Sequence, residues 1–251
     1  MLVRAVLLTL LAAVAQAAEV PNVAVAANLN FALPEIAAAF RQRTGREVKL
    51  AFGASGNFSR QIREGAPFEL FLSADEANVR FLVEAGRAEG EGVVYAVGRL
   101  SLFAPAASPV AVDPGLAGLA AAVKAGTARR VAIANPELAP YGKAAREALQ
   151  KKGLWDALAG RIVLGENVNQ TAQFALTGGV EAAFIPYSIV VAPNFKDRGR
   201  WALVPDTQHE PIRQRMVLVR GAGEAARALY DFVRGPEGRA ILERYGFSVP
   251  Q

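Results

Sequence analysis

The sequence contains no cysteine and a single histidine, His209. Without cysteine the chain forms no disulfide, no thiolate metal site and no cysteine nucleophile. One histidine disfavours both a histidine-based catalytic triad and a metal site built from several imidazoles. His209 stands in a polar stretch, residues 206–210, and we expect it to be solvated rather than catalytic. These shortages remove most enzymatic chemistry, so we do not expect an enzyme.

Basic residues are present but scattered. Charged residues make up 20% of the chain, the formal net charge is +5, and no run of five or six basic residues occurs. Such a pattern indicates a generally basic surface and predicts no nucleic-acid partner. With 52% hydrophobic residues in a chain of 251, a substantial core can form in one large domain or in two lobes.

A long apolar run occurs only at the N-terminus, where residues 1–18 have the pattern of a signal peptide. Arg4 supplies the positive charge, and residues 6–14 form an apolar core shorter than the ~20 residues of a membrane span. Residues 15–17 are Ala-Gln-Ala, a cleavage pattern. Cleavage after Ala17 or Ala18 predicts an exported protein, and no cysteine near the cut could carry a lipid anchor.

Strands and helices alternate along the remaining chain, which predicts an α/β fold. Residues 105–114 are rich in Pro, Ala and Ser, and this shift in composition marks the exit from a first lobe. The expected strands are short apolar runs at 23–27, 48–52, 69–72, 93–97, 100–104, 131–134, 162–164, 182–185 and 216–219.

Four residues stand where a predicted strand gives way to a helix: Asn28, Ser55, Tyr141 and Val168. In an open α/β sheet this is the usual place for a ligand, and the unpaired amides of a helix start suit an anion. Two junctions precede the Pro-rich segment and two follow it, so two lobes could aim all four at one compact oxyanion. Taken singly, each has a structural alternative: Asn28 or Asn30 as a helix cap, Ser55 as a turn residue, Tyr141 as a packed ring, and Val168 as an apolar residue offering only its backbone.

Five segments together resemble the periplasmic molybdate-binding proteins of molybdate ABC transporters. They are AANLNFALPEIAAAFRQRTG (26–45), FGASGNFSRQIREGAPFELFLSAD (52–75), ANPELAPYGKAAREALQKKGLWDAL (134–158), GENVNQTAQFALTGG (165–179) and YDFVRGPEGRAILERYGF (230–247). The resemblance extends from residue 23 to residue 247, and the second segment is its most specific part.

The resemblance implies a two-lobed type II periplasmic binding protein fold with the ligand in the interlobe cleft. We expect a signal peptide at 1–18, a first lobe at 19–103 plus 216–251 and a second lobe at 104–215, with a hinge at 100–104 and 216–219. By the family pattern, Asn28 and Ser55 would bind from the first lobe, and Tyr141 and the backbone of Val168 from the second. Ala27 and Tyr187 are two further candidates, because members of the family place ligand hydroxyls near these positions.

The implied function is capture of molybdate or tungstate and its delivery to a membrane permease. The metal would be bound as an oxyanion, not as a cation, with no cofactor, and the protein would act as a monomer. Three alternatives stay open at this point: a receptor for sulfate or phosphate, an exported hydrolase, and a protein with a purely structural or partner-binding role. The sequence Gly53-Ala54-Ser55-Gly56 is not the G-x-S-x-G motif of a hydrolase, which disfavours the second alternative.

Overall fold

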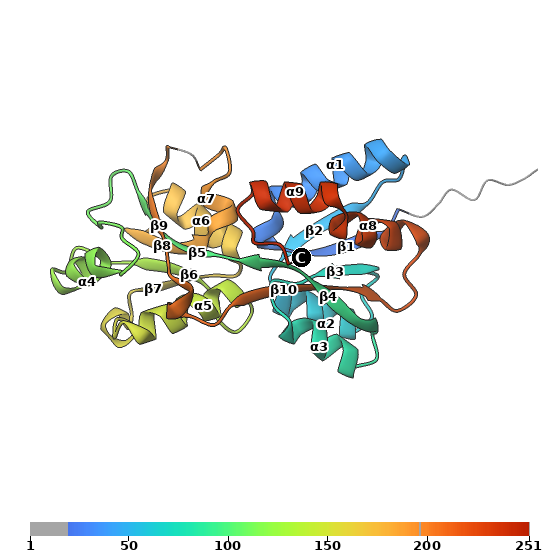
Figure 1. The fold of residues 1–251 in the computed structure, drawn as a ribbon. Coiled ribbons are helices and arrows are strands. Elements are labelled where there is room, and N and C mark those ends of the chain that lie inside the picture. Colours follow the sequence, from blue (N-terminus) through green and yellow to red (C-terminus); the bar gives the residue numbers. More distant parts are fainter. Residues whose placement is uncertain (1–19, 196, 251) are drawn as a thin grey trace, which may run out of the picture.

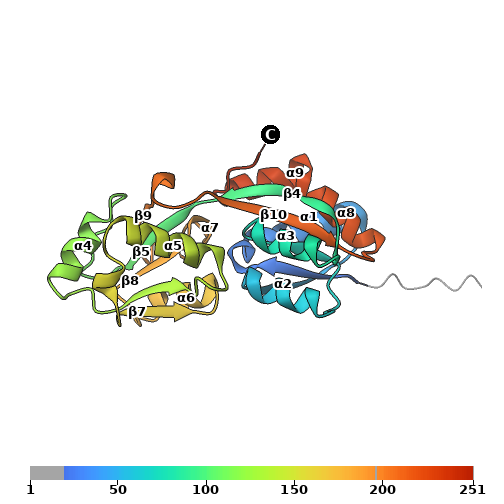
Figure 2. The same cartoon turned by 90° about the horizontal axis from the view of Figure 1, so that it is seen from below.

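The computed structural model describes residues 20–195 and 197–250. Two α/β lobes lie end to end, and each is built on a five-stranded sheet with helices packed on its faces (Figures 1 and 2). This is the α/β architecture in two lobes that the sequence predicts. The predicted signal peptide, 1–18, falls outside the described residues.

The first sheet has the strand order β2, β1, β3, β10, β4. Three strands run parallel: β1 (Asn22–Ala26), β2 (Lys49–Gly53) and β3 (Leu70–Leu72). The late strand β10 (Ile212–Val219) returns antiparallel between β3 and β4 (Ala88–Gly98). Because parallel strands present their carboxyl ends at one edge, the turns that follow β1, β2 and β3 gather there.

Alternating side chains of this sheet enter two separate cores, as the period of a strand requires. Val23 and Val25 of β1 lie in the core under α1, α8 and α9, whereas Ala24 between them lies in the core under α2 and α3. The helices of this lobe are α1 (Ala32–Thr44), α2 (Ser55–Arg63), α3 (Ala77–Glu84), α8 (Glu224–Arg234) and α9 (Pro236–Arg244).

The second sheet has the order β7, β6, β8, β5, β9, which repeats the pattern of the first. Again three strands are parallel and the fourth runs against them. Its strands are β5 (Leu100–Pro105), β6 (Val131–Ala134), β7 (Ile162–Gly165), β8 (Ala182–Pro186) and β9 (Gly199–Leu203). Its helices are α4 (Ala117–Lys124), α5 (Pro140–Lys151), α6 (Val168–Leu176) and α7 (Tyr187–Val190), with short 3₁₀ turns at Asp156–Leu158 and Asp206–Gln208.

The chain passes between the two sheets twice, at Arg99 between β4 and β5 and through residues 204–211 between β9 and β10. Sheet membership therefore differs from the predicted lobe limits. β5 pairs with β8 and β9 of the second sheet, although residues 100–103 were assigned to the first lobe. Hydrogen-bond partners, and not the change in composition after β5, decide which sheet a strand joins.

Residues 212–215, which the sequence analysis assigned to the second lobe, belong to the first sheet. β10 begins at Ile212, because Arg213, Gln214 and Arg215 alternate between exposed and buried positions and continue the pairing with β4. The two predicted hinge segments, 100–104 and 216–219, each lie inside one sheet, and the connections between the sheets lie next to them. Within the described residues, no helix is both long and apolar enough to cross a membrane.

Neither Asn28 nor Asn30 caps α1. Asn28 lies in a 3₁₀ turn, η1 (Ala27–Leu29), and the helix begins after Phe31 without a side-chain cap. At the other end of α1, Gly45 has a φ of 70°, the left-handed conformation that glycine adopts without steric cost. Asn28 therefore does not act as a helix cap, and its side chain is available for other contacts.

Candidate ligand-binding site

A small cavity lies between the lobes where the parallel strands of both sheets end. Its volume is about 10 Å³, close to the least room that holds one water molecule. None of the described residues that line it has a charged side chain, and both lobes contribute. They are Ala26, Ala27, Asn28, Gly53, Ala54, Ser55 and Ala74 from the first lobe, and Ala139, Pro140, Tyr141, Asn167 and Val168 from the second.

The structure thus brings the four predicted residues together from positions up to 140 residues apart, as the numbers of Asn28 and Val168 show. A larger and more open groove of about 390 Å³ adjoins this cavity and shares Ala139 and Pro140 with it. Three basic side chains line the groove, Arg60, Arg63 and Lys143, against two carboxylates, Asp75 and Glu137, so basic groups are in slight excess. Basic side chains at the approach to a cleft raise the local concentration of anions.

Ser55 is the first residue of α2 and is buried. Its Oγ accepts a hydrogen bond from the amide of Ala74 at 3.0 Å, so the hydroxyl hydrogen is not used in that bond and can donate into the cavity. The first amides of a helix have no acceptor within it. The turn after β2 therefore offers both a hydroxyl and a helix-start amide, as the sequence indicates.

Val168 is the first residue of α6 and lines the cavity, and its only hydrogen-bond donor is the backbone amide. The side chain of Asn167 caps this helix by accepting from the amides of Asn169 at 3.0 Å and Gln170 at 3.2 Å. The Val168 amide precedes these two and has no acceptor within the helix. The cap thus satisfies the second and third amides of α6 and leaves the first one for the cavity.

Tyr141 is the second residue of α5 and follows Pro140, which has no amide hydrogen to offer. Its phenol is buried and reaches towards the first lobe, where Gln214 Nε2 donates to the phenol oxygen at 3.0 Å. Burial raises the pKa of Tyr141 well above its ordinary value, against the smaller opposing effects of hydrogen bonds from Gln214 and Asn28. The phenol therefore keeps its proton and is a hydrogen-bond donor.

Asn28 lines the cavity from the first lobe, as Tyr141 does from the second. Its Nδ2 donates to Gln214 Oε1 at 2.9 Å, and its backbone oxygen accepts from Ser188 Oγ of the second lobe at 2.8 Å. Within the described part of the chain, Asn28 Oδ1 is buried without a hydrogen-bond partner. Oδ1 is an acceptor, so a water molecule can pair with it but an oxyanion cannot; what Asn28 can offer an anion is the second hydrogen of Nδ2.

Of the two further candidates, Ala27 and Tyr187, only Ala27 lies in the cavity. Ala27 lines the cavity but has only a methyl group to offer. Tyr187 lies outside it, with the Arg99 guanidinium 4.3 Å from its ring centroid and Trp201 packed edge-on.

His209 is 3% exposed, and its Nδ1 lies 2.8 Å from the Glu210 oxygen. The expectation that His209 is solvated was therefore wrong, because its ring is turned inward although Asp206, Thr207 and Glu210 around it are exposed.

Direct contacts hold the two lobes together around the cavity. The amide of Gly56 donates to the Leu138 oxygen at 2.9 Å, and Asn57 Nδ2 donates to Glu166 Oε1 at 3.0 Å. A Cβ atom on Gly56 would lie 3.0 Å from that same Leu138 oxygen, so glycine permits the close approach. The structure is thus a closed arrangement, with donors from both lobes enclosing one small space.

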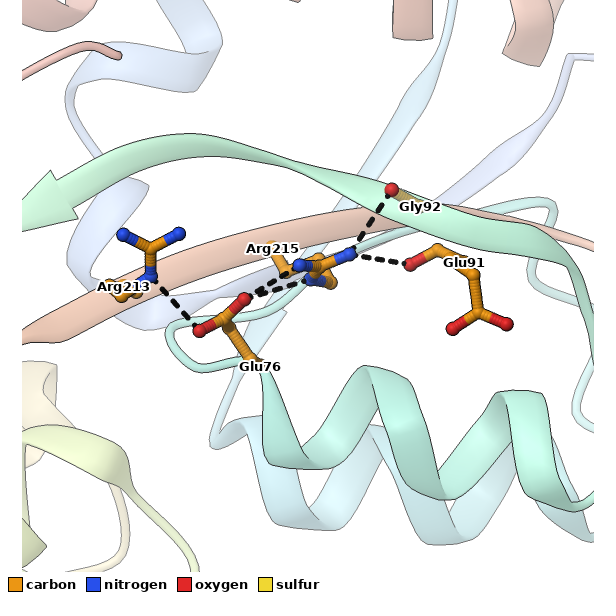
Figure 3. A network of polar contacts seen from close by, with 5 residues as sticks. All are labelled: Glu76, Glu91, Gly92, Arg213 and Arg215. Atoms are coloured by element: carbon orange, nitrogen blue, oxygen red, sulfur yellow. Dashed lines mark hydrogen bonds and ion pairs between the residues drawn. The ribbon is translucent and has the colours of Figure 1, made fainter.

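Sequence reasoning missed Gln214, which is fully buried between the lobes. Its neighbours on β10, Arg213 and Arg215, both point to the opposite face and bind the carboxylate of Glu76 (Figure 3). Burial by itself raises the pKa of Glu76, but the hydrogen bonds and charges of Arg215 and Arg213 together outweigh it and lower the pKa. The alternating pattern of Ile212 to Arg215 was the signal in the sequence that could have revealed this strand and the buried glutamine.

Two lobes of matching topology with a small donor-lined cavity between them define a solute-binding protein, and the comparisons agree. The model of the bacterial extracellular solute-binding protein family matches residues 21–248, so the chain belongs to that family. It is 41% identical over 227 residues to the molybdate-binding protein ModA of Rhodobacter capsulatus, covering 89% of this chain and 86% of that protein. It is 40% identical over 243 residues to ModA of Azotobacter vinelandii, covering 96% and 94%. Within its class, the chain belongs to the ModA family.

The solved structures place the fold in the same family. The periplasmic molybdate-binding protein of Azotobacter vinelandii matches with a TM-score of 0.83 at 30% identity, covering 92% of this chain and 100% of that one. These relatives are binding proteins and not enzymes, which excludes the hydrolase alternative. The sulfate-binding protein SubI of Mycobacterium tuberculosis shares the fold, with a TM-score of 0.74 at 17% identity over 92% of this chain and 86% of that one. The fold alone therefore does not choose the anion.

Proposed function

We propose that this protein binds molybdate, or the closely similar tungstate, between the lobes and delivers it to the permease of a molybdate ABC transporter. The interlobe cavity of about 10 Å³ has to widen by a small separation of the lobes to admit the anion. The observation that carries the proposal is the convergence of uncharged donors from both lobes at Asn28, Ser55, Tyr141 and Val168. The metal enters as its oxyanion and needs no cofactor. The protein acts as a monomer in the periplasm, after removal of a signal peptide near Ala17 or Ala18.

The donor set suits a small dianion that leaves its water shell behind. Amides at helix starts carry partial positive charge, and hydroxyl and amide donors direct hydrogens at fixed positions. Uncharged donors hold an anion without the bidentate geometry that arginine imposes. In a closed, dry cavity each of these bonds is stronger than in water. Ala27 contributes no hydroxyl, so selectivity in this chain depends on the other four positions and on the cavity's size.

Size is the basis of selectivity between tetrahedral anions. Sulfate is smaller than molybdate and leaves some of the fixed donors too far away for good hydrogen bonds. One or two unmade charge-assisted bonds, at about 1.5–3 kcal/mol each, amount to roughly a tenfold to ten-thousandfold preference. Molybdate and tungstate differ little in size and shape, so we expect both to bind.

A thermal-shift panel with molybdate, tungstate, sulfate and phosphate tests the proposal. A ligand at a thousand times its Kd stabilises the native state by about 4 kcal/mol, which for a chain of this size is a rise of roughly 8–16 °C in Tm. We expect such a rise with molybdate and tungstate only. An equal rise with sulfate would show that the site does not select molybdate and that the assigned specificity is wrong, and no rise with any of the four anions would contradict the proposed function.

A further inference from the structure

Gln214 lies at the centre of a hydrogen-bond chain that joins the two lobes behind the cavity. It is not among the residues that line the cavity. Its Oε1 accepts from Asn28 Nδ2 at 2.9 Å and from the Tyr95 hydroxyl at 2.8 Å, and its Nε2 donates to the Tyr141 oxygen at 3.0 Å. Every partner of its amide is buried, as Gln214 itself is. Two of these partners, Asn28 and Tyr141, are proposed side-chain donors to the ligand, together with Ser55.

The direction of this chain decides what Tyr141 can do. With Nε2 donating to the phenol oxygen, the single phenol hydrogen is left to point into the cavity. If the Gln214 amide were reversed, Oε1 would face Tyr141 and would take that hydrogen. The Asn28 amide opposes the reversal, because its Nδ2, which donates to Oε1 at 2.9 Å, would then face a second donor, Nε2. The Tyr95 hydroxyl has one hydrogen and two acceptors in reach, Oε1 at 2.8 Å and the Ser73 oxygen at 3.1 Å, and it supports the same orientation when it donates to Oε1.

The surrounding fold holds this arrangement in place. Burial is the main reason that the pKa values of Tyr95 and Tyr141 are both raised, so both hydroxyls stay protonated. The pairing of β10 with β4 shifts register between Gln214 and Arg215, which leaves Tyr95 as an extra residue in β4. Such a bulge redirects a side chain, here towards Gln214. On the other face of β10, Glu76 binds the two flanking arginines and fixes the strand (Figure 3).

We infer that Gln214 is a positioning residue that sets the donor direction of Asn28 and Tyr141 and so makes the cavity a receptor for oxyanions. This inference rests on the proposed function and names a residue outside the cavity on which that function depends. A glutamate at position 214 would accept hydrogens at both oxygens, would take the phenol hydrogen of Tyr141 and would place a negative charge behind the anion. A leucine would remove the polar contacts without adding charge.

The experiment is calorimetric titration of molybdate into the wild type, Q214E, Q214L and Q150E at pH 8. Gln150 is exposed at the end of α5 and serves as a charge control. We expect Q214L to lose about 10- to 100-fold in affinity, Q214E to lose more than 100-fold, and Q150E to stay within twofold of the wild type.

A pH series separates positioning from a merely structural effect. A protonated glutamate has one donor and one acceptor and so resembles glutamine, and burial raises the pKa of such a carboxyl. The affinity of Q214E should therefore recover at least tenfold between pH 8 and pH 6. The wild type is measured in the same buffers as a control. The charged groups that act on this network, Asp75 on Tyr95 and Arg99 on Tyr141, are present in both the wild type and Q214E, so they do not account for a difference between the two. The wild-type affinity should change by less than threefold.

The outcomes are distinct. If the wild type binds molybdate and Q214E binds within threefold of it, or shows no recovery at low pH, the inference about Gln214 is wrong and the proposed function stands. If the wild type binds no oxyanion, the proposed function itself fails. Should Q214E not fold, Y95F decides, because it removes a hydrogen bond to Oε1 without touching the cavity. A loss of threefold to tenfold in affinity supports the inference, and an unchanged affinity overturns it.

Discussion

Substitution of Gly98 by alanine tests the closed arrangement of the lobes. Gly98 is the last residue of β4 in the first lobe, and a Cβ atom there would lie 2.5 Å from Gln214 Nε2 and 2.8 Å from Tyr141 Cζ, and closer still to the phenol oxygen. Real Cβ contacts are practically never shorter than 3.0 Å, so the buried phenol has to move. Because Tyr141 belongs to the second lobe, its overlap with the Cβ atom arises when the lobes meet and opposes closure around the ligand. The smaller overlap with Gln214, at the end of a flexible side chain of the first sheet, exists in either state.

The size of the effect follows from the cost of overpacking. Extra atoms in a well-packed interior typically cost about 1–3 kcal/mol, and we expect most of that cost to fall on the closed, ligand-bound form. Molybdate affinity should therefore fall about 5- to 150-fold in calorimetric titrations. Gly235→Ala is the matched control, because its Cβ would come no closer than 3.3 Å to another atom, and it lies at the start of α9. Unchanged affinity in Gly98→Ala would show that Tyr141 and Gln214 are not arranged in this way when the ligand is bound.

Two further substitutions probe the phenol and the Glu76 contacts. Tyr141→Phe removes the phenol donor and leaves Gln214 Nε2 without its acceptor, so molybdate binding should weaken by about 1–3 kcal/mol in calorimetry, and equal affinity would remove Tyr141 from the site. Glu76→Gln should lower the free energy of unfolding in urea by about 1–2 kcal/mol at pH 7, because Arg213 and Arg215 both lose their charged partner. The contact with Arg213 contributes less of this, because that side chain is half exposed and solvent screens its charge. The lowered pKa of Glu76 means that this wild-type advantage is complete above the ordinary value of 4.5 and disappears as the pH falls through the lower folded value. A difference between the two proteins that persisted in strong acid would exclude the charged contact as its cause.

The sequence was informative where local chemistry decides the structure. Ser55 and Val168 each stand at a helix start after a parallel strand, so the position of each at the carboxyl edge of its own sheet could be expected. That the two edges face each other was implied only by the family resemblance. The strands expected at 131–134, 162–164 and 182–185 were predicted as short apolar runs, and the structure has them as Val131–Ala134, Ile162–Gly165 and Ala182–Pro186. These features depend on short-range patterns that a single sequence contains.

Features that depend on partners distant in the sequence were missed. β10 was expected to begin at 216, because Arg213 and Arg215 hid the strand that their contacts with Glu76 stabilise. β9 was not predicted, because it is an edge strand that exposes Trp201 and begins with glycine. The burial of His209 follows from contacts that its polar neighbours make with α5, such as the Glu210 amide donating to Glu147 Oε2 at 2.9 Å. None of these contacts has a local signature.

The most direct test of the proposed site compares the wild type with Ser55→Ala in calorimetric titrations of molybdate. Ser55 lines the cavity with a buried hydroxyl whose hydrogen is not used in its bond to Ala74. We predict one molybdate per wild-type chain, and in Ser55→Ala an affinity lower by about 1–3 kcal/mol, or roughly 5- to 150-fold. The ligand-free Tm is measured in parallel, so that a loss of folding is not mistaken for a loss of binding. Equal affinity in the two proteins would contradict the assignment of this cavity as the molybdate site.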